Sequence, residues 1–458
     1  MKKKQDPIAW IVYLFIVVIV LFMGSIMLRM FTKNILVEKI GMNNTFTKFV
    51  LDGMSTADVL DEATGEFYTN INWEAMYPFQ EEAKDSVEAA TYENNSLINN
   101  LLAKINWLEY VVEQYCNEYL AGRVSFVEKA YSYEKIMGWS LIPFGSDDGI
   151  IIGDDGYLTY AMDKVDVTSM AQHVSDLHDF LEERDIPLLY IQAPSKVDPI
   201  SPDLPAGVSD FSNDNMDRLL EALKEKGVDY LDLRNYILEN YEVYEDAFYK
   251  TDHHWKTTTA FGAVSYLTDY LNEKYGYEFS NGLYEKANYH IALYEKYFLG
   301  SQGKKVTLSV VEPEDYELVE PLLETDFTIK IPERSIDTRG TFGETLLDYR
   351  HLQNIDYYGE NCYASFMNRN DAYAQIINNA PICNKDKKIL MIKDSYSTPF
   401  IPYLALGVGE IDTVYEMLFT GSIQTYIEQE QPDLVIVMYS STSLNGNADS
   451  HSAFFNLE

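Results

Sequence analysis

Short runs rich in β-branched residues alternate with amphipathic segments in the chain after residue 149, and this alternation restricts the fold more than any other feature. The sequence predicts strands at residues 187–192, 228–233, 388–393, 410–415 and 433–438, and helices at residues 168–183, 215–226 and 256–275. Strands separated by helices usually pair in parallel, and the helices cover both faces of the sheet. We therefore expect an α/β fold with a parallel sheet sandwiched by helices.

Two segments depart from this alternation. Residues 149–160 read as a β-hairpin around a Gly-Asp-Asp-Gly turn at residues 153–156. Between residues 276 and 379 the strand–helix rhythm is lost. We interpret this stretch as an insertion with β structure at 304–311 and 327–331 and a helix near 371–379.

The N-terminus carries a membrane-anchor signal. Three lysines at positions 2–4 precede an uncharged run from residue 7 to residue 28. As a helix this run would span about 33 Å, close to the hydrocarbon thickness of a bilayer. The basic flank predicts a cytoplasmic N-terminus and an extracytoplasmic remainder. A cleaved signal peptide is the alternative, although residues 23–27 lack an obvious small-x-small cleavage site.

Residues 33–140 are predicted to be a linker followed by helical structure. From residue 85 to 120, apolar residues recur at spacings of three and four, including Leu97, Leu101, Ile105, Leu108 and Val112. A second helix is expected at residues 124–137. The pair would form either a stalk or a helical hairpin packed on the following domain. The resulting domain prediction is an anchor at 1–32, a linker and stalk at 33–140, and an α/β domain at 141–458.

Charge and cysteine content exclude several classes of function. The chain has 35 Lys and Arg against 72 Asp and Glu, a formal net charge of −37, which opposes nucleic-acid binding. Cys116, Cys362 and Cys383 are too few and too scattered for a disulfide framework or a zinc site. We interpret them as ordinary thiols, with a Cys362–Cys383 bridge as the alternative.

The run Asp252-His253-His254-Trp255 is the strongest candidate for a functional site. Side chains at positions i and i+2 of an extended loop lie on the same side, which pairs Asp252 with His254 and directs His253 away. A carboxylate that accepts the Nδ1 proton of an imidazole leaves Nε2 free to act as a general base. Adjacent histidines do not easily bind one ion, so we expect no catalytic metal.

A nucleophile is expected where a parallel strand ends, because ligands bind beyond the carboxyl ends of such strands. Ser395 follows the strand at 388–393 on a turn into an apolar segment. In that position a serine exposes its hydroxyl and directs its backbone N–H toward a developing oxyanion. The alternative is that Asp394, Ser395 or Ser397 caps the following helix. The loop at residues 193–196 follows another strand, and Lys196 in it is expected to bind loop carbonyls or carboxylates.

The Asp252-His253-His254-Trp255 run and the Lys393-Asp394-Ser395-Tyr396 turn together resemble the bacterial DHHW family. That family is similar to the SGNH-hydrolase-like domains of alginate O-acetyltransferases, in which an Asp-x-His motif precedes a serine motif. The resemblance extends from residue 150 to the C-terminus and includes the hairpin and the 194–196 loop. Lys393 departs from the pattern, since many SGNH enzymes have glycine there.

The resemblance implies an SGNH-hydrolase-like fold and a Ser395, His254 and Asp252 triad that transfers an acyl group through an acyl-enzyme. The implied activity is O-acetylation of a cell-surface or secreted polysaccharide. It needs no bound cofactor, because a membrane-bound acyltransferase partner would supply the acyl group.

Four further residues are candidates for substrate or oxyanion contacts. Gly300 and Asn361 lie in loops that could supply an N–H or an amide, although both loops also read as simple turns. Trp255 could line the sugar site or pack in the core. His253 is expected to make a supporting hydrogen bond. A carbohydrate esterase with the same triad and a non-catalytic surface assembly protein remain the alternative functions.

Overall fold

A computed structural model of the chain describes residues 150–444 apart from positions 154, 155, 206, 281, 368, 416, 417 and 420, together with scattered positions between 24 and 142. The predicted membrane anchor, linker and helical stalk therefore fall largely outside the described residues. No helix in the part of the chain that is described is both long and apolar enough to cross a membrane. The larger of two compact units contains residues 148–458 with two short preceding segments, and only this unit is considered below.

An eight-stranded sheet forms the centre of this unit, in the order β5-β4-β13-β11-β12-β10-β8-β9. The five predicted strands are confirmed and run parallel to one another: β5 (Asp229–Asp232), β4 (Leu188–Gln192), β13 (Leu434–Tyr439), β11 (Lys388–Lys393) and β12 (Glu410–Tyr415). Every residue of β4 and β13 is buried, as expected for a sheet covered on both faces.

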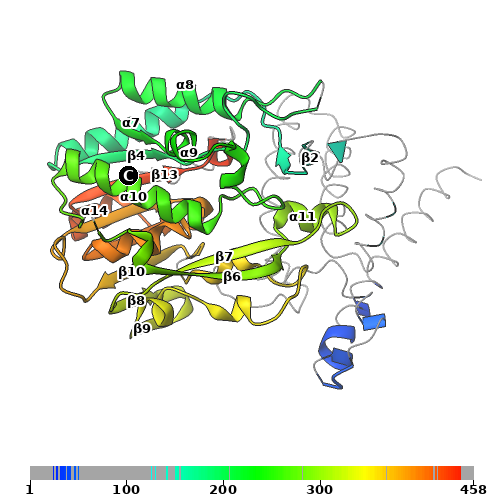
Figure 1. The fold of residues 1–458 in the computed structure, drawn as a ribbon. Coiled ribbons are helices and arrows are strands. Elements are labelled where there is room, and N and C mark those ends of the chain that lie inside the picture. The colour runs from blue at the N-terminus through cyan, green and yellow to red at the C-terminus, as the bar shows by residue number, and fades with distance from the viewer. Residues whose placement is uncertain are drawn as a thin grey trace, which may run out of the picture. The chain divides into compact units, whose positions relative to one another are not determined.

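Helices cover both faces of the sheet (Figure 1). Alternate strand residues therefore belong to two separate hydrophobic cores. One core joins the sheet to α7 (Thr168–Glu182), α8 (Ser212–Glu225) and α14 (Ile423–Glu430). The other joins it to α9 (Arg234–Asn240), α10 (Thr257–Tyr275) and α13 (Phe400–Leu404). Leu189 and Ile191 face the second core while Leu188 and Tyr190 face the first, so the period-two pattern of a strand accounts for the layers.

The predicted hairpin is also confirmed. Strands β2 (Ile150–Ile152) and β3 (Leu158–Tyr160) pair antiparallel, and β1 (Leu141–Ile142) adds a third strand. The Leu158 N–H donates to the Lys250 carbonyl at 2.9 Å, which ties the hairpin to the loop that carries the two histidines.

The segment between residues 276 and 379 contains three strands of the main sheet. Strands β8 (Phe327–Ile331), β9 (Ile336–Gly340) and β10 (Tyr373–Asn378) extend the sheet antiparallel beyond β12. Strands β6 (Tyr289–Phe298) and β7 (Glu314–Pro321) form a separate two-stranded antiparallel ribbon (Figure 1). Helix α12 (Phe342–Thr345) follows β9.

Two local predictions in this segment are wrong. The helix expected near residues 371–379 is strand β10, where Ala374, Ile376 and Asn378 are buried in the alternation typical of a strand. The strand expected at residues 304–311 is instead helix α11 (Ser301–Val306) followed by a turn. Backbone contacts of residues 300–303 with the histidine loop fix this helix, so tertiary contacts override the local β propensity.

Candidate active site

The loop that carries Asp252 and His254 is short and closed on itself. Phe248 and Trp255 form an isolated β-bridge, and the Tyr249 N–H donates to the His254 carbonyl at 3.2 Å. Helix α10 begins directly afterwards at Thr257, whose side chain is buried. The loop is therefore fixed at both ends before any side chain contributes.

Ser395 lies at the carboxyl end of β11, as the strand pattern predicts. It opens the 3₁₀ turn η7 (Ser395–Ser397), and Asp394 caps this turn by accepting the Tyr396 N–H at 3.0 Å. The other Asp394 oxygen accepts the Ser440 N–H at 2.6 Å and the Ser443 hydroxyl at 2.8 Å. The capping interpretation thus applies to Asp394, and it leaves the Ser395 hydroxyl available.

The structure brings Ser395, His254 and Asp252 into one hydrogen-bonded chain. Ser395 Oγ is 2.9 Å from His254 Nε2, and His254 Nδ1 is 2.6 Å from Asp252 Oδ1. Asp252 and His254 are buried, whereas Ser395 is partly exposed. The arrangement has the order of a nucleophile, a general base and an orienting carboxylate.

Asp252 is held as a carboxylate by its surroundings. Its Oδ1 atom accepts the His254 backbone N–H at 3.0 Å, and Oδ2 accepts the Ser301 N–H at 2.6 Å. Burial alone would raise the pKa of Asp252. The neighbouring imidazoles and these hydrogen bonds outweigh burial and hold the pKa well below its ordinary value.

His253 lies beside His254 and is not directed away from it. The two ring centroids are 3.8 Å apart, and His253 Nδ1 is 3.1 Å from Ser301 Oγ. The expected supporting hydrogen bond is therefore present, but the i, i+2 argument misplaced the ring. Burial, and then the neighbouring His254, lower the pKa of His253 to about 3.

Comparison with known proteins assigns part of the chain to a family. Residues 147–287 match the family model described as the SGNH hydrolase-like domain of the acetyltransferase AlgX. These residues are similar to an SGNH hydrolase-like domain. The matched range contains Asp252 and His254 and ends before Ser395. Among curated proteins, none matches the sequence.

Solved structures share the fold of the SGNH hydrolase-like domain. The structure of Bacillus cereus PatB1 has a TM-score of 0.55 at 19% identity, over 68% of this chain and 100% of that chain. A PatB1 structure with a sulfonyl adduct has a TM-score of 0.56 at 20% identity, over 68% of this chain and 99% of that chain. A DHHW family protein from Eubacterium siraeum has a TM-score of 0.50 at 17% identity, over 69% of this chain and 97% of that chain. The predicted resemblance to SGNH-hydrolase-like domains is confirmed by the family model, and the DHHW family protein shares the fold.

Trp255 does not line a sugar site. Its side chain is completely buried, its ring stacks on Phe400, and its Nε1–H donates to the Tyr396 carbonyl at 3.0 Å. The Tyr396 hydroxyl donates in turn to the His253 carbonyl. Trp255 and Tyr396 therefore join the histidine loop to the serine turn, and the packing interpretation of Trp255 is the right one.

Gly300 is not available as an oxyanion donor, because its N–H donates to Thr251 Oγ1 at 2.9 Å. The Asn361 side chain accepts the Tyr363 N–H at 3.1 Å and caps the turn η6 (Cys362–Ser365). Among the described residues, none accepts a hydrogen bond from the Ser395 N–H. That N–H is therefore a candidate donor for charge developing next to Ser395 Oγ.

Several contributors to the site carry no recognisable sequence motif. The Tyr363 ring stacks on the His254 ring with centroids 4.0 Å apart, and Ser440 and Ser443 hold Asp394. They come from segments far from both motifs in sequence, so no spacing rule could have indicated them. Lys196 was anticipated: its Nζ donates to the carbonyls of Lys250 at 3.0 Å and Asp252 at 2.8 Å.

Lys393 lies completely buried at the position where many SGNH enzymes have glycine. Its Nζ donates to the Arg369 carbonyl and is 3.4 Å from Asn370 Oδ1. The lysine thus extends away from the turn to bind the 369–370 segment, and the Asp394 cap keeps its contacts.

Asp252, His253 and His254 have potential metal-ligand atoms within 4.8 Å of one another. Both ring nitrogens of His254 are engaged with Asp252 and Ser395, so an ion would have to displace the hydrogen bonds just described. Cys362 and Cys383 are free thiols, which excludes the disulfide alternative.

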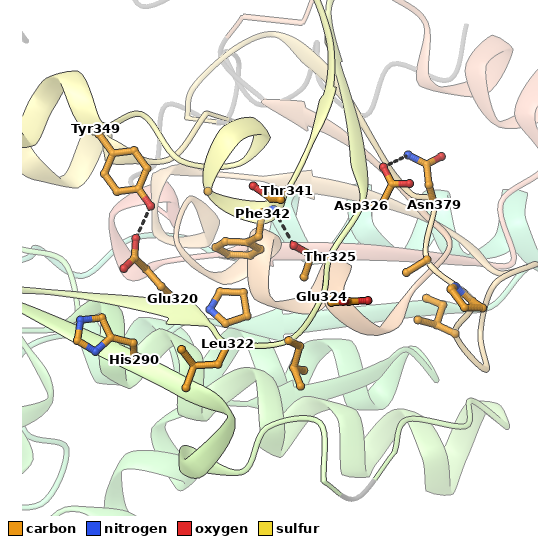
Figure 2. Close-up of a pocket in the computed structure, with 16 residues that line it drawn as sticks. His290, Glu320, Leu322, Glu324, Thr325, Asp326, Thr341, Phe342, Tyr349 and Asn379 are labelled. Atoms are coloured by element: carbon orange, nitrogen blue, oxygen red, sulfur yellow. Dashed lines mark hydrogen bonds between the residues drawn. The ribbon is translucent and has the colours of Figure 1, made fainter.

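A groove of about 940 Å³ lies at the opposite end of the sheet. Figure 2 shows the Tyr349 hydroxyl directed at the Glu320 carboxylate, with His290, Leu322 and Phe342 nearby. The groove includes residues 379–382, which directly follow β10. Ile377 near the end of β10 pairs with Glu410 at the beginning of β12, whereas Lys393 beside the serine turn pairs with Tyr415 at the end of β12. It contains no triad residue.

Proposed function

We propose that the SGNH hydrolase-like domain is an O-acyltransferase that moves an acetyl group to a hydroxyl of a cell-surface or secreted polysaccharide. The observation that carries this proposal is the hydrogen-bonded chain from Ser395 through His254 to Asp252. Acetyl transfer is supported by the family model, which is described as a domain of the acetyltransferase AlgX. The polysaccharide acceptor is proposed from the resemblance of the two motifs to alginate O-acetyltransferases.

In the proposed first step, Ser395 Oγ attacks the carbonyl carbon of the acyl donor while His254 Nε2 takes the hydroxyl proton. The carbonyl oxygen becomes an oxyanion, which the Ser395 N–H stabilises. Collapse of this intermediate breaks the bond to the leaving group, and His254 returns the proton to it. The product is an acyl ester of Ser395.

In the second step the acceptor hydroxyl loses its proton to His254 and attacks the acyl-Ser395 carbonyl. Ser395 then leaves as an alkoxide and recovers the proton from His254. Asp252 remains a carboxylate throughout, and it stabilises the imidazolium that forms twice per cycle.

The proposed location is the extracytoplasmic face of a membrane, with residues 1–32 as anchor. This placement rests on the three lysines and the apolar run that follows them. Acetyl-coenzyme A is a cytoplasmic donor, so a membrane-bound partner would have to pass the acetyl group outward.

Hydrolysis competes with transfer at the same site, because water could replace the acceptor hydroxyl. Supplying glycan acceptors together with a small acetyl ester distinguishes the two activities. Acetylated glycan would support the transferase, while hydrolysis alone with every acceptor would favour a carbohydrate esterase.

The test of the site is the variant Ser395→Ala. We expect hydrolysis of a small acetyl ester to fall by roughly 10³-fold or more, because the nucleophile is lost. Ser201→Ala, at an exposed serine far from the triad in sequence, serves as the matched control. Equal turnover by Ser395→Ala and the parent protein would disprove the triad and favour a non-catalytic surface protein.

A further inference from the structure

A carboxylate of the β6–β7 ribbon binds the loop that carries Asp252 and His254. Glu314, the first residue of β7, accepts the Lys250 N–H on Oε2 at 2.7 Å. Its Oε1 atom accepts both the Thr251 N–H at 2.7 Å and the Thr251 hydroxyl at 2.5 Å. One side chain thus takes three hydrogen bonds from the two residues that precede Asp252.

Thr251 passes this constraint to the turn that binds Asp252. Thr251 Oγ1 accepts the Gly300 N–H at 2.9 Å, and the Thr251 carbonyl accepts the Gly303 N–H at 2.8 Å. Between these two points, the Ser301 N–H reaches Asp252 Oδ2 at 2.6 Å. The orientation of the Asp252 carboxylate therefore depends on where Thr251 is held.

The same stretch of backbone is bound from its carbonyl side by Lys196, through the oxygens of Lys250 and Asp252. Glu314 thus binds backbone N–H groups of this stretch, and Lys196 binds its backbone carbonyls. Burial raises the pKa of Glu314 in spite of its three hydrogen bonds, which is the cost of placing a carboxylate there.

We infer that Glu314 is a positioning residue for the triad: by fixing residues 250 and 251 it sets the Asp252 carboxylate against His254. This inference rests on the proposed function for its catalytic consequence. Its structural consequence, the geometry of the Asp252–His254 hydrogen bond, is independent of the reaction. The β6–β7 ribbon then supports the active site through Glu314, although it contributes no reacting group.

The kinetic test compares Glu314→Gln and Glu314→Ala with the parent on a small acetyl ester. A glutamine keeps one acceptor oxygen but turns an N–H donor toward a backbone N–H. We expect kcat to fall roughly 10- to 100-fold, more for alanine, with KM nearly unchanged, because a slightly misplaced general base slows chemistry without weakening binding. Glu312→Gln, at an exposed neighbour that pairs with Lys296, is the matched control and should keep the parent kcat.

A second pair of variants protects the test against misfolding. Thr251→Val removes the hydroxyl that links Glu314 to Gly300, whereas Thr251→Ser keeps it. We expect Thr251→Ser to restore most of the kcat lost in Thr251→Val. If Glu314→Gln is folded by circular dichroism and retains the parent kcat, or if its loss of kcat only tracks its unfolded fraction, the positioning role is wrong.

Proton NMR of the full chain separates this inference from the proposed function. A short hydrogen bond between His254 Nδ1 and Asp252 gives a far-downfield proton resonance, assigned by its loss in Asp252→Asn. We expect this resonance to move or broaden in Glu314→Gln and to stay in place in Glu312→Gln. An unchanged resonance in Glu314→Gln overturns the inference even if Ser395 proves to be catalytically inactive.

Discussion

Two adjacent histidines have different chemical environments in this site. His254 is bonded at both ring nitrogens, to Asp252 and to Ser395, and its ring touches Tyr363. His253 bonds Ser301 and lies against His254, so that a proton on one ring repels a proton on the other. With its pKa lowered to about 3, His253 stays neutral, while in the proposed mechanism His254 exchanges protons with Ser395.

The lowered pKa of His253 predicts how acid affects stability. An unfolded histidine binds a proton below its ordinary pKa of about 6.5, whereas the folded protein does not until about pH 3. Over that interval the unfolded state binds more protons, so the free energy of unfolding falls as the pH falls. Replacing His253 by Gln removes this difference.

Urea unfolding at pH 7 and pH 5 measures the effect. The free energy of unfolding of His253→Gln, minus that of the parent, should be higher at pH 5 than at pH 7 by roughly 1–2 kcal/mol. His290→Gln, at an exposed histidine, is the comparison variant. The same dependence on pH in His253→Gln and the parent would contradict the environment described for His253.

At the scale of elements, the 300–303 turn lies against the histidine loop with no spare room. A Cβ added to Gly300 would lie 2.3 Å from Asp252 Cβ and 2.6 Å from the Thr251 carbonyl oxygen. A glycine is needed here because of close approach, and its N–H has a structural role in place of the expected oxyanion role.

Gly300→Ala should therefore push the turn away from Asp252. We expect a loss of about 1–3 kcal/mol in the free energy of unfolding, typical of overpacking, together with a lower kcat. Gly282→Ala provides the control, since the nearest atom to its added Cβ is 3.8 Å away. Denaturant unfolding gives the free energy of unfolding of both variants, and ester hydrolysis gives their kcat. If both quantities in Gly300→Ala equal those of the parent, the close contact is contradicted.

The elements that could be predicted from the sequence are those with a strong local pattern. Five strands and their parallel pairing followed from β-branched runs, and Ser395 followed from its place after one of them. The antiparallel extension was missed in part because β10 carries only a weak alternation and pairs with strands distant in the chain. Glu314 was missed because its partner Thr251 is 63 positions away and no motif links them.

At the scale of the whole molecule, the proposed anchor determines where the acidic domain works. A net charge of −37 disfavours contact with anionic membrane surfaces, so association with a membrane would depend on the apolar run at residues 7–28. This run lies largely outside the described residues, and its role is inferred from composition alone.

Deleting residues 1–32 tests the anchor. We expect the full chain to sediment with membranes and to resist extraction by high salt, while the deleted chain appears in the soluble fraction. Persistent membrane association of the deleted chain would contradict the anchor, and a soluble full chain would favour a cleaved signal peptide.

The most direct test of the proposed chemistry is detection of the acyl-enzyme. The full chain is mixed with a small acetyl ester, quenched in acid, digested and analysed by mass spectrometry. We predict one added acetyl group on Ser395 in the parent and none at this position in His254→Ala, which lacks the base that activates the serine. Rapid turnover of the ester with acetyl found on another residue, or with acetylation of Ser395 equal in both proteins, would contradict the proposed mechanism.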